Sequence, residues 1–452
     1  MTPAEAAALF EAYDPARDGP FDRRRAAHLL RRAGFGGTAG DIDDAVARGP
    51  ADTLAWVLAD PGPADPLADG VARVLAGRLD TEPLRGMQTR WLDRMLRAPR
   101  PLVERLTLFW HDHFATSFRK VGDPVLMERQ VLTLRAFALA SFRALLAAVA
   151  RDPAMLVWLD GNENRKAHPN ENFARELLEL FALGVGHYTE QDVREAARAF
   201  TGWHVRDRDF RFVQEEHDDG PKSLLGEKGR LSGDDVIRIV LERPRAAQFL
   251  AAKLLDLFVG PIADEALVEP VARRLRDTRY AIRPAVEMIL RSRLFFGERA
   301  IGRKVRSPVD YALGAVLALG ARVELGPLAA DIDEMGLSLL QPPDVDGWEG
   351  GAAWINAATL GARYRFAKRL TSETGGPGDA PCFDPLAILE GRRIRDPEAS
   401  VDHFLSLLLA REVGAGTREE LVTHARNGPG GPAERAREVV RLILTLPEAH
   451  LG

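Results

Sequence analysis

Apolar residues return at helical spacing along most of this chain. Windows in which they recur every three or four residues predict helices, because that spacing places them on one face of a 3.6-residue turn. The windows with this pattern are 51–58, 90–96, 101–114, 123–150, 170–183, 190–201, 245–259, 262–278, 282–291, 308–319, 357–370, 401–409 and 432–446. The pattern predicts an all-α protein, a large multi-helix body with long ordered loops.

Strand patterns are scarce. β-branched and aromatic residues cluster only in 203–213, which predicts either the arm of a hairpin or an ordered loop. Two loops rich in turn-forming residues, 214–233 and 374–381, are candidate boundaries. They divide the chain into three regions. Residues 1–213 form an N-terminal helical region with the candidate site, residues 214–373 a second helical region packed on the first, and residues 374–452 a C-terminal helical tail.

Composition narrows the classes of function. The chain has 452 residues and a net charge of −5, so no global basic field favours nucleic acid, and we expect no such partner. The single cysteine, Cys382, excludes a disulfide framework or a cysteine-based zinc site within one chain. No window approaches ~18 uninterrupted apolar residues, so we expect no membrane span. The N-terminus lacks a basic segment followed by an apolar run, so we expect a cytoplasmic location, with the periplasm or export as the alternative.

The segment 168–184 carries more polarity than an ordinary buried helix. Beside its apolar stripe runs a polar stripe at i, i+4 and i+7, formed by Asn172, Glu176 and Glu179. A ladder at i, i+4 and i+8 adds further charges, from Glu171, Arg175 and Glu179. Amides, carboxylates and a guanidinium this close together are costly to bury unless each is satisfied, so such networks mark functional sites or structural keystones.

Two interpretations of this helix stay open. In the functional one, Glu176 and Glu179 are acid/base carboxylates or metal ligands, and Asn170, Asn172 and Arg175 orient them. In the structural one, an asparagine caps the helix and the charged ladder lies on the surface. The structural interpretation does not explain why Glu176 lies next to the apolar stripe.

A histidine pair closes the helix predicted for 101–114. His111 and His113 are two residues apart and therefore point to different faces, so both can bind one metal only if the helix ends there. The residues at 115–117 permit such an ending. We consider His111, His113 and Glu176 a candidate set of metal ligands, with His111 also a candidate catalytic group. Alternatively, one histidine is a hydrogen-bonded core residue and the other is solvated.

Later segments supply candidate substrate-binding residues besides Asn170 and Asn172. Trp203 follows the central helices, and the segment 217–222 contributes an imidazole and an ammonium, His217 and Lys222. The segment 341–348 has two prolines, an aspartate and a tryptophan, which predict a rigid loop. Asp344 and Trp348 of this loop are candidates to line a cleft for a carbohydrate or another flat ligand. Alternatively, the loop is a structural wedge between helices.

Taken together, these segments resemble the bacterial family known as domain of unknown function 1800. The resemblance runs in order from about residue 26 to the C-terminus, through 28–36, 109–114, 170–184, 200–203, 217–222 and 342–348. It implies a predominantly helical bacterial protein without assigned catalytic residues. Genes of such relatives often lie beside those of a second family, numbered 1501, whose members look exported and resemble sulfatases or phosphatases. A product of such a gene is therefore an expected partner. Where relatives usually carry histidine, this chain has Phe181, which argues against a ligand at that position.

Three functions follow from these candidates. The first is a metal-assisted hydrolase or lyase that uses His111, His113, Glu176 and Glu179 with a divalent metal ion. The second is a non-enzymatic helical scaffold, or a maturation or transport partner of a neighbouring envelope enzyme. The third is a glycan-active enzyme in which Glu176 and Glu179 are acid and base, or in which Asp112 or Asp344 is the second carboxylate. We rank them in this order from the sequence.

Overall fold

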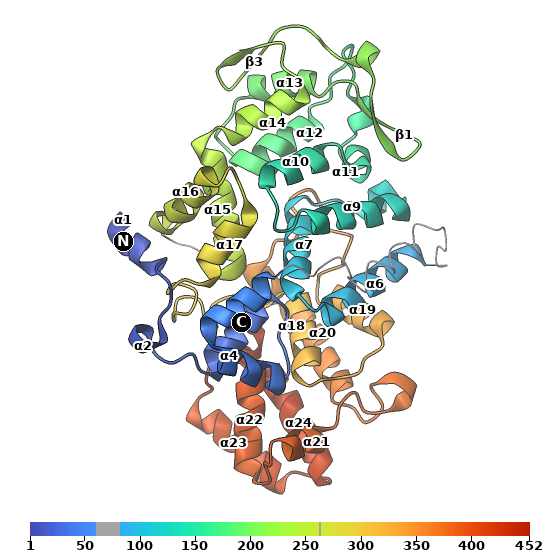
Figure 1. Ribbon diagram of the computed structural model, residues 1–452. Coiled ribbons are helices and arrows are strands. Elements are labelled where there is room, and N and C mark those ends of the chain that lie inside the picture. Colours follow the sequence, from blue (N-terminus) through green and yellow to red (C-terminus); the bar gives the residue numbers. More distant parts are fainter. Residues whose placement is uncertain (60–81, 262–263) are drawn as a thin grey trace.

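The computed structural model describes residues 1–59, 82–261 and 264–452, and most of them are helical (Figure 1). The α-helices are α1 (Pro3–Leu9), α2 (Pro15–Asp18), α3 (Arg23–Ala33), α4 (Ala39–Leu58), α6 (Pro83–Arg97), α7 (Pro101–His113), α8 (Phe118–Val121), α9 (Pro124–Ala136), α10 (Phe142–Ala150), α11 (Pro153–Trp158), α12 (Asn172–Glu176), α13 (Glu190–Ala199), α14 (Gly233–Leu241), α15 (Pro244–Phe258), α16 (Val268–Asp277), α17 (Ile282–Leu290), α18 (Pro308–Ala318), α19 (Leu325–Glu334), α20 (Ala357–Leu370), α21 (Pro385–Gly391), α22 (Pro397–Leu408), α23 (Ala415–Asn427) and α24 (Pro432–Thr445). The prediction of a predominantly α-helical protein is confirmed.

The remaining regular elements are short. A π-helix, η2 (Leu177–Leu183), follows α12 directly. The 3₁₀ turns are η1 (Gly161–Glu163), η3 (Gln214–Glu216), η4 (Glu265–Leu267), η5 (Gly351–Trp354), η6 (Pro377–Asp379) and η7 (Pro447–His450). Two antiparallel hairpins pair β1 (Trp203–Arg206) with β2 (Asp209–Phe212) and β3 (Lys222–Leu224) with β4 (Glu227–Gly229). The first hairpin settles the alternative left open for 203–213, whereas the second lies in a segment predicted to be a loop.

One predicted helix is wrong in its extent. The window 123–150 forms two helices, α9 and α10, because the chain turns between them. Ser141 makes an isolated bridge to Ala281, and the amide nitrogen of Phe142 donates to the carbonyl of Tyr280 at 2.8 Å. Residues 262 and 263, the first two of the window 262–278, lie outside the described residues.

Helix α3, near the start of the chain, lies against segments from its C-terminal part. One hydrophobic core cluster contains buried side chains from Ala6 to Ala449. The guanidinium of Arg31 in α3 donates to the carbonyl of Leu407 in α22 at 2.6 Å, and that of Arg32 donates to the carbonyl of Gly452 at 2.8 Å. Arginine side chains therefore join segments that are far apart in sequence.

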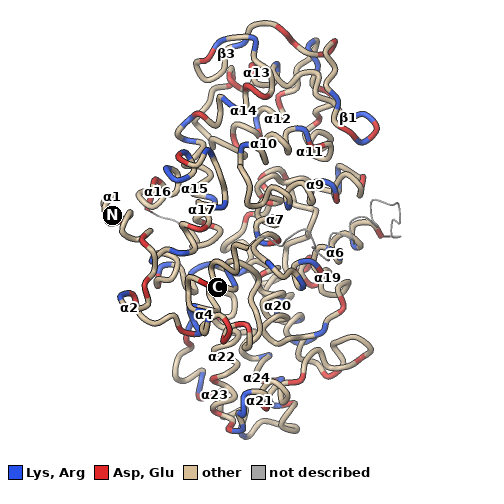
Figure 2. The backbone as a smooth tube through the Cα atoms, in the orientation of Figure 1, with Lys and Arg blue, Asp and Glu red and all other residues tan. Residues whose placement is uncertain are grey.

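Charges of both signs alternate along the chain rather than gathering in one segment (Figure 2). Among the residues the structure describes, no helix is both long enough and apolar enough to cross a bilayer.

Candidate functional site

A cavity of about 240 Å³ lies between the end of α7, the π-helix η2, α15 and the loop 341–348. Its polar and aromatic lining residues are Phe109, Asp112, His113, Glu179, Phe249, Lys253, Asp346 and Trp348. Four residues singled out in the sequence, Asp112, His113, Glu179 and Trp348, therefore meet here from distant segments, whereas Glu176 is not among the lining residues. We call this the carboxylate cavity.

The helix that carries the two candidate glutamates is not a single α-helix. It is α-helical only over α12 and continues as the π-helix η2. π-helical turns are rare and occur frequently at functional sites. At the end of η2, side chains satisfy carbonyls that have no partner within the helix. Nε2 of His113 donates to the carbonyl of Phe181 at 3.1 Å, and Nε of Arg245 donates to the carbonyl of Leu183 at 3.0 Å.

Glu176 has an unusual proton affinity for a glutamate. Burial raises its pKa to about 6, and repulsion from the carboxylates of Glu179 and Asp346 contributes to that rise. Glu179 accepts a hydrogen bond from the hydroxyl of Tyr188. A carboxyl group with this pKa can hold and release a proton close to neutral pH, as acid–base catalysis requires.

Asp112 anchors the loop 341–348 to the end of α7. The amide nitrogen of Trp348 donates to Oδ1 of Asp112 at 2.9 Å. Gly347 has φ of +85°, and a Cβ atom there would lie 2.7 Å from the main-chain oxygen of Asp112. Only glycine permits this close approach. Burial raises the pKa of Asp112 to about 6, against the lowering effect of the hydrogen bond from Trp348.

The histidine pair separates, although α7 does end at His113. His111 lies between the rings of Trp91 and Trp348, with centroid distances of 5.3 and 5.7 Å. Neither of its ring nitrogens has a hydrogen-bond partner in the described part of the chain. His113 instead faces the carboxylate cavity and bonds to the carbonyl of Phe181. Burial lowers the pKa of each imidazole to about 3.

The proposed metal ligands do not form a metal site in this arrangement. Within residues 1–59, 82–261 and 264–452, no group of three or more histidine, cysteine, aspartate and glutamate side chains is placed to hold a metal ion. His111, His113 and Glu176 are all described and do not form such a group. The physical reason is that two positions two residues apart on α7 face different surroundings, an aromatic contact and a cavity.

Because His111 is buried without a partner, it should make the protein sensitive to acid. Its pKa is near 6.5 when unfolded and about 3 when folded, so its contribution to stability is complete above pH 6.5 and is lost as the pH falls towards 3. As the pH falls from 8 to 5, we expect the unfolding free energy of His111→Phe to rise by about 2 kcal/mol relative to that of the wild type, because only the wild type loses the stability linked to His111. Urea titrations at both pH values measure this gain.

The matched control for this prediction is His187→Gln, since His187 is exposed. This variant should keep the pH dependence of the wild type. A His111→Phe protein that loses as much stability on acidification as the wild type would contradict the account.

A model of the family described as "Protein of unknown function (DUF1800)" matches residues 28–451. The chain belongs to the DUF1800 family. The matched range contains every residue that lines the carboxylate cavity of this DUF1800 protein. No curated protein and no solved structure matches it.

The asparagines of the DUF1800 protein shape the entry to α12 rather than line the carboxylate cavity. The amide nitrogen of Asn170 donates to Oδ1 of Asn164 at 2.9 Å, and Oδ1 of Asn170 accepts from the amide nitrogen of Asn172 at 2.9 Å. The side-chain amide of Asn172 donates to Asp160 at 3.0 Å. These bonds are those of a turn that leads into a helix.

Arg175, predicted to orient the catalytic glutamates, also points elsewhere. Its guanidinium binds Glu190 at 2.8 Å and Glu171 at 3.0 Å. The predicted ladder thus forms between Glu171 and Arg175, whereas Glu179 bonds to Tyr188 instead. The positive charge of Arg175 lowers the pKa of Glu176 and so offsets part of the rise caused by burial and by the neighbouring carboxylates.

Three predicted substrate-binding residues lie in or between the two hairpins. Trp203 is buried against Phe200 and Phe210. Nδ1 of His217 donates to the carbonyl of Thr201 at 2.9 Å. Lys222 is buried and donates to the carbonyls of Asp218 and Gly220, and burial lowers its pKa. None of the three is among the residues that line the carboxylate cavity.

Sequence reasoning missed four residues of the site. Asp346 belongs to the same loop as Asp344, the aspartate predicted to line a cleft. Asp344 is exposed, and its Oδ1 accepts a hydrogen bond from the amide nitrogen of Asp346 at 3.0 Å. Asp346 is exposed as well, so no pattern of exposed and buried positions in this loop distinguishes the two aspartates. Tyr188, Phe249 and Lys253 carry no comparable sequence signal.

Proposed function

We propose that this DUF1800 protein is a glycan-active acid–base enzyme, a hydrolase or a lyase, that works in the carboxylate cavity. One observation carries the proposal: Glu176 has a pKa of about 6 and lies close enough to Glu179 and Asp346 for their charges to raise it. Cleavage of a glycosidic bond needs two carboxyl groups with different proton affinities, one protonated and one ionised.

Each carboxyl group has a separate role in this proposal. Glu176 lies beside the cavity, near Glu179 and Asp346, and is the general acid that gives its proton to the oxygen of the leaving sugar. Glu179 is the base or the nucleophile, and the hydroxyl of Tyr188 holds its carboxylate in place. Asp112 is a positioning residue, because it fixes the backbone of Trp348.

The lining of the cavity favours one class of sugar. Trp348 and Phe249 offer aromatic faces on which a sugar ring can stack. Three carboxylates, those of Asp112, Glu179 and Asp346, are opposed by the single ammonium of Lys253. Because such a cavity repels polyanions, we expect neutral glycans or glycans with amino sugars.

This proposal reverses the order that the sequence suggested. The metal-assisted hypothesis depended on His111 and His113, which are held by an aromatic contact and by the carbonyl of Phe181. The carboxylate hypothesis is supported by the raised pKa of Glu176 and by the aromatic side chain of Trp348 in the cavity lining.

A glycan screen tests the proposal. Purified wild-type protein and Glu179→Gln are incubated with neutral, amino and sulfated oligosaccharides, and products are followed by mass spectrometry. We expect the wild type to cleave neutral or amino glycans and to leave sulfated ones intact, and we expect Glu179→Gln to be inactive. A folded protein that neither cleaves nor binds any glycan would favour the scaffold instead.

The pH profile should identify the acid. Since Glu176 must be protonated to donate, kcat/KM should fall as the pH rises above about 6, by about tenfold per pH unit. Initial rates from pH 4 to 9 measure this limb. Asp112 has a pKa of about 6 as well, so Asp112→Asn is the matched control and should keep the limb. If the limb disappears in Asp112→Asn, Glu176 is not the acid.

A further inference from the structure

A groove of about 890 Å³ lies among the last four α-helices, α21, α22, α23 and α24. Figure 1 shows these helices together at the end of the molecule opposite the two hairpins. Helices α21, α22 and α24 and the turn at 392–396 supply most of its lining, and α23 contributes Ala425. We call this the C-terminal groove.

The floor of the C-terminal groove is apolar. Three helices supply buried side chains that line it, none of them more than 6% exposed, namely Leu389, Val401, Phe404 and Val439. The short side chain of Ala436 in α24 also lines the groove and leaves room above this floor. An apolar molecule that enters the groove therefore exchanges water for hydrocarbon contacts.

The charged side chains that line the groove are mostly cationic. They are Arg393, Arg395 and Arg435, against the single carboxylate of Glu390. Arg393 and Arg395 are exposed in the turn between α21 and α22. In the part of the chain that the structure describes, no ion pair joins any of these three arginines to a carboxylate. The groove is therefore positively charged in a chain whose net charge is −5.

Arginines of the same bundle that do not line the groove are paired. Arg418 and Arg426 of α23 bind the carboxylate of Glu398 at 2.9 and 3.1 Å. The arginines of the groove, in contrast, keep their charge for an anionic group of a ligand. A guanidinium group binds a carboxylate well, because its planar pairs of N–H donors match the two carboxylate oxygens.

The size of the groove favours a small molecule over a protein. Ligand pockets usually measure roughly 300–1,000 Å³. A protein partner would need about 800 Å² of surface on this side, with apolar side chains around the groove as well as inside it. In the described ranges, the exposed large apolar side chains all lie outside α21–α24, namely Met1, Val185, Phe212, Leu360 and Tyr364.

We propose that the C-terminal groove binds a long-chain fatty acid. The acyl chain lies on the apolar floor, and the carboxylate binds the arginines, Arg393, Arg395 and Arg435. Apolar floor and cationic rim together match a molecule with an apolar body and one anionic head.

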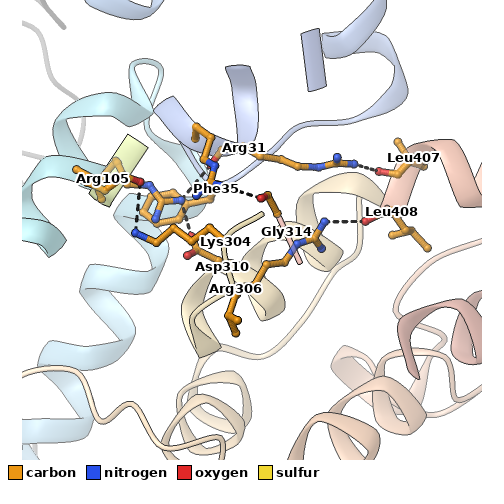
Figure 3. A pocket seen from close by; sticks show the side chains of 13 residues that line it. Arg31, Phe35, Arg105, Lys304, Arg306, Asp310, Gly314, Leu407 and Leu408 are labelled. Carbon is orange, nitrogen blue, oxygen red and sulfur yellow. Dashed lines mark hydrogen bonds and ion pairs between the residues drawn. The ribbon is translucent and has the colours of Figure 1, made fainter. Parts of the chain in front are cut away.

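This binding site is independent of the proposed glycan activity, because no residue lines both the C-terminal groove and the carboxylate cavity. The far end of α22 is anchored on the rest of the protein. Figure 3 shows Arg31 and Arg306 reaching the carbonyls of Leu407 and Leu408 there. None of these four residues lines the groove, so a ligand in it leaves this junction intact.

Calorimetry on the full-length protein tests the proposal. The protein is titrated at pH 8 with sodium dodecanoate below its micelle-forming concentration, with sodium octanoate, and with dodecyltrimethylammonium as a cationic control. We expect about one equivalent of dodecanoate to bind. Octanoate, which has four fewer CH₂ groups, should bind at least tenfold more weakly, and the cation should not bind.

Three results would overturn the proposal. One is a wild-type protein that does not bind dodecanoate, and another is one that binds the cation as tightly. The third is a groove that binds an acidic amphipathic peptide but not dodecanoate, which would make it a protein-docking surface. These results come from the wild type and decide the question even if a variant does not fold.

Variants locate the site. Ala436→Phe fills the groove and should weaken dodecanoate binding at least tenfold. Its matched control is Ala433→Phe, since Ala433 is also half-buried in α24 but does not line the groove. The double variant Arg393→Gln/Arg395→Gln should weaken binding at least tenfold, whereas Arg426→Gln should keep the wild-type affinity. Undiminished binding by both groove variants would contradict the assignment.

Discussion

Glu176→Gln is expected to lower kcat/KM on the glycan substrate by about 100- to 10,000-fold, the usual range for the loss of a general acid. The melting temperature should change little. Burial already favours the protonated carboxyl group, and a neutral amide of the same shape resembles that form while removing the repulsion from Glu179 and Asp346. Initial rates and thermal unfolding of the same preparation measure the two effects.

Glu171→Gln controls for a change of charge in the same segment. Glu171 binds Arg175 at 3.0 Å outside the carboxylate cavity, so its variant should keep kcat/KM within about twofold of the wild type, since surface ion pairs contribute little. Equal losses in the two variants would show that charge at this helix, rather than a proton from Glu176, governs the rate.

Glu128→Ala is expected to lower the free energy of unfolding by about 3–5 kcal/mol. Glu128 in α9 pairs with Arg94 in α6 at 3.1 Å, and the two side chains are 1% and 6% exposed. Removing the carboxylate leaves the guanidinium charge buried without its partner. Urea unfolding measures the loss.

Two further variants make this prediction specific. Glu334→Ala breaks an exposed pair with Arg365 at 2.7 Å and should cost less than about 1 kcal/mol. The double variant Arg94→Met/Glu128→Leu replaces the buried pair by apolar groups and should recover much of the loss. A double variant as unstable as Glu128→Ala would show that packing, not the unpaired charge, explains the effect.

Helical periodicity predicted the fold class because most helices bury one apolar face. It failed at 123–150, where the apolar pattern runs on through a turn held by distant backbone partners, Tyr280 and Ala281. It also missed β3 and β4, which are too short, at three residues each, to show alternation.

The candidate site was predictable in its parts but not in its assembly. The chemistry of Glu176, Glu179 and Trp348 is visible in the sequence. The meeting of Glu179 and Trp348 with Phe249 and Lys253 depends on how distant segments pack, which no local pattern encodes. Spacing also could not tell that His111 would face two tryptophan rings while His113 faced the cavity, because that choice depends on the neighbours of α7.

The arginines that join the two ends of the chain have a consequence for biosynthesis. Arg31 and its acceptor Leu407 are separated by 376 residues. At the usual 5–20 residues per second, a ribosome needs roughly 20–75 s to cover that interval. During this time α3 is exposed without its last partners, so the N-terminal helices of the nascent chain must await the final helices or be protected by a chaperone.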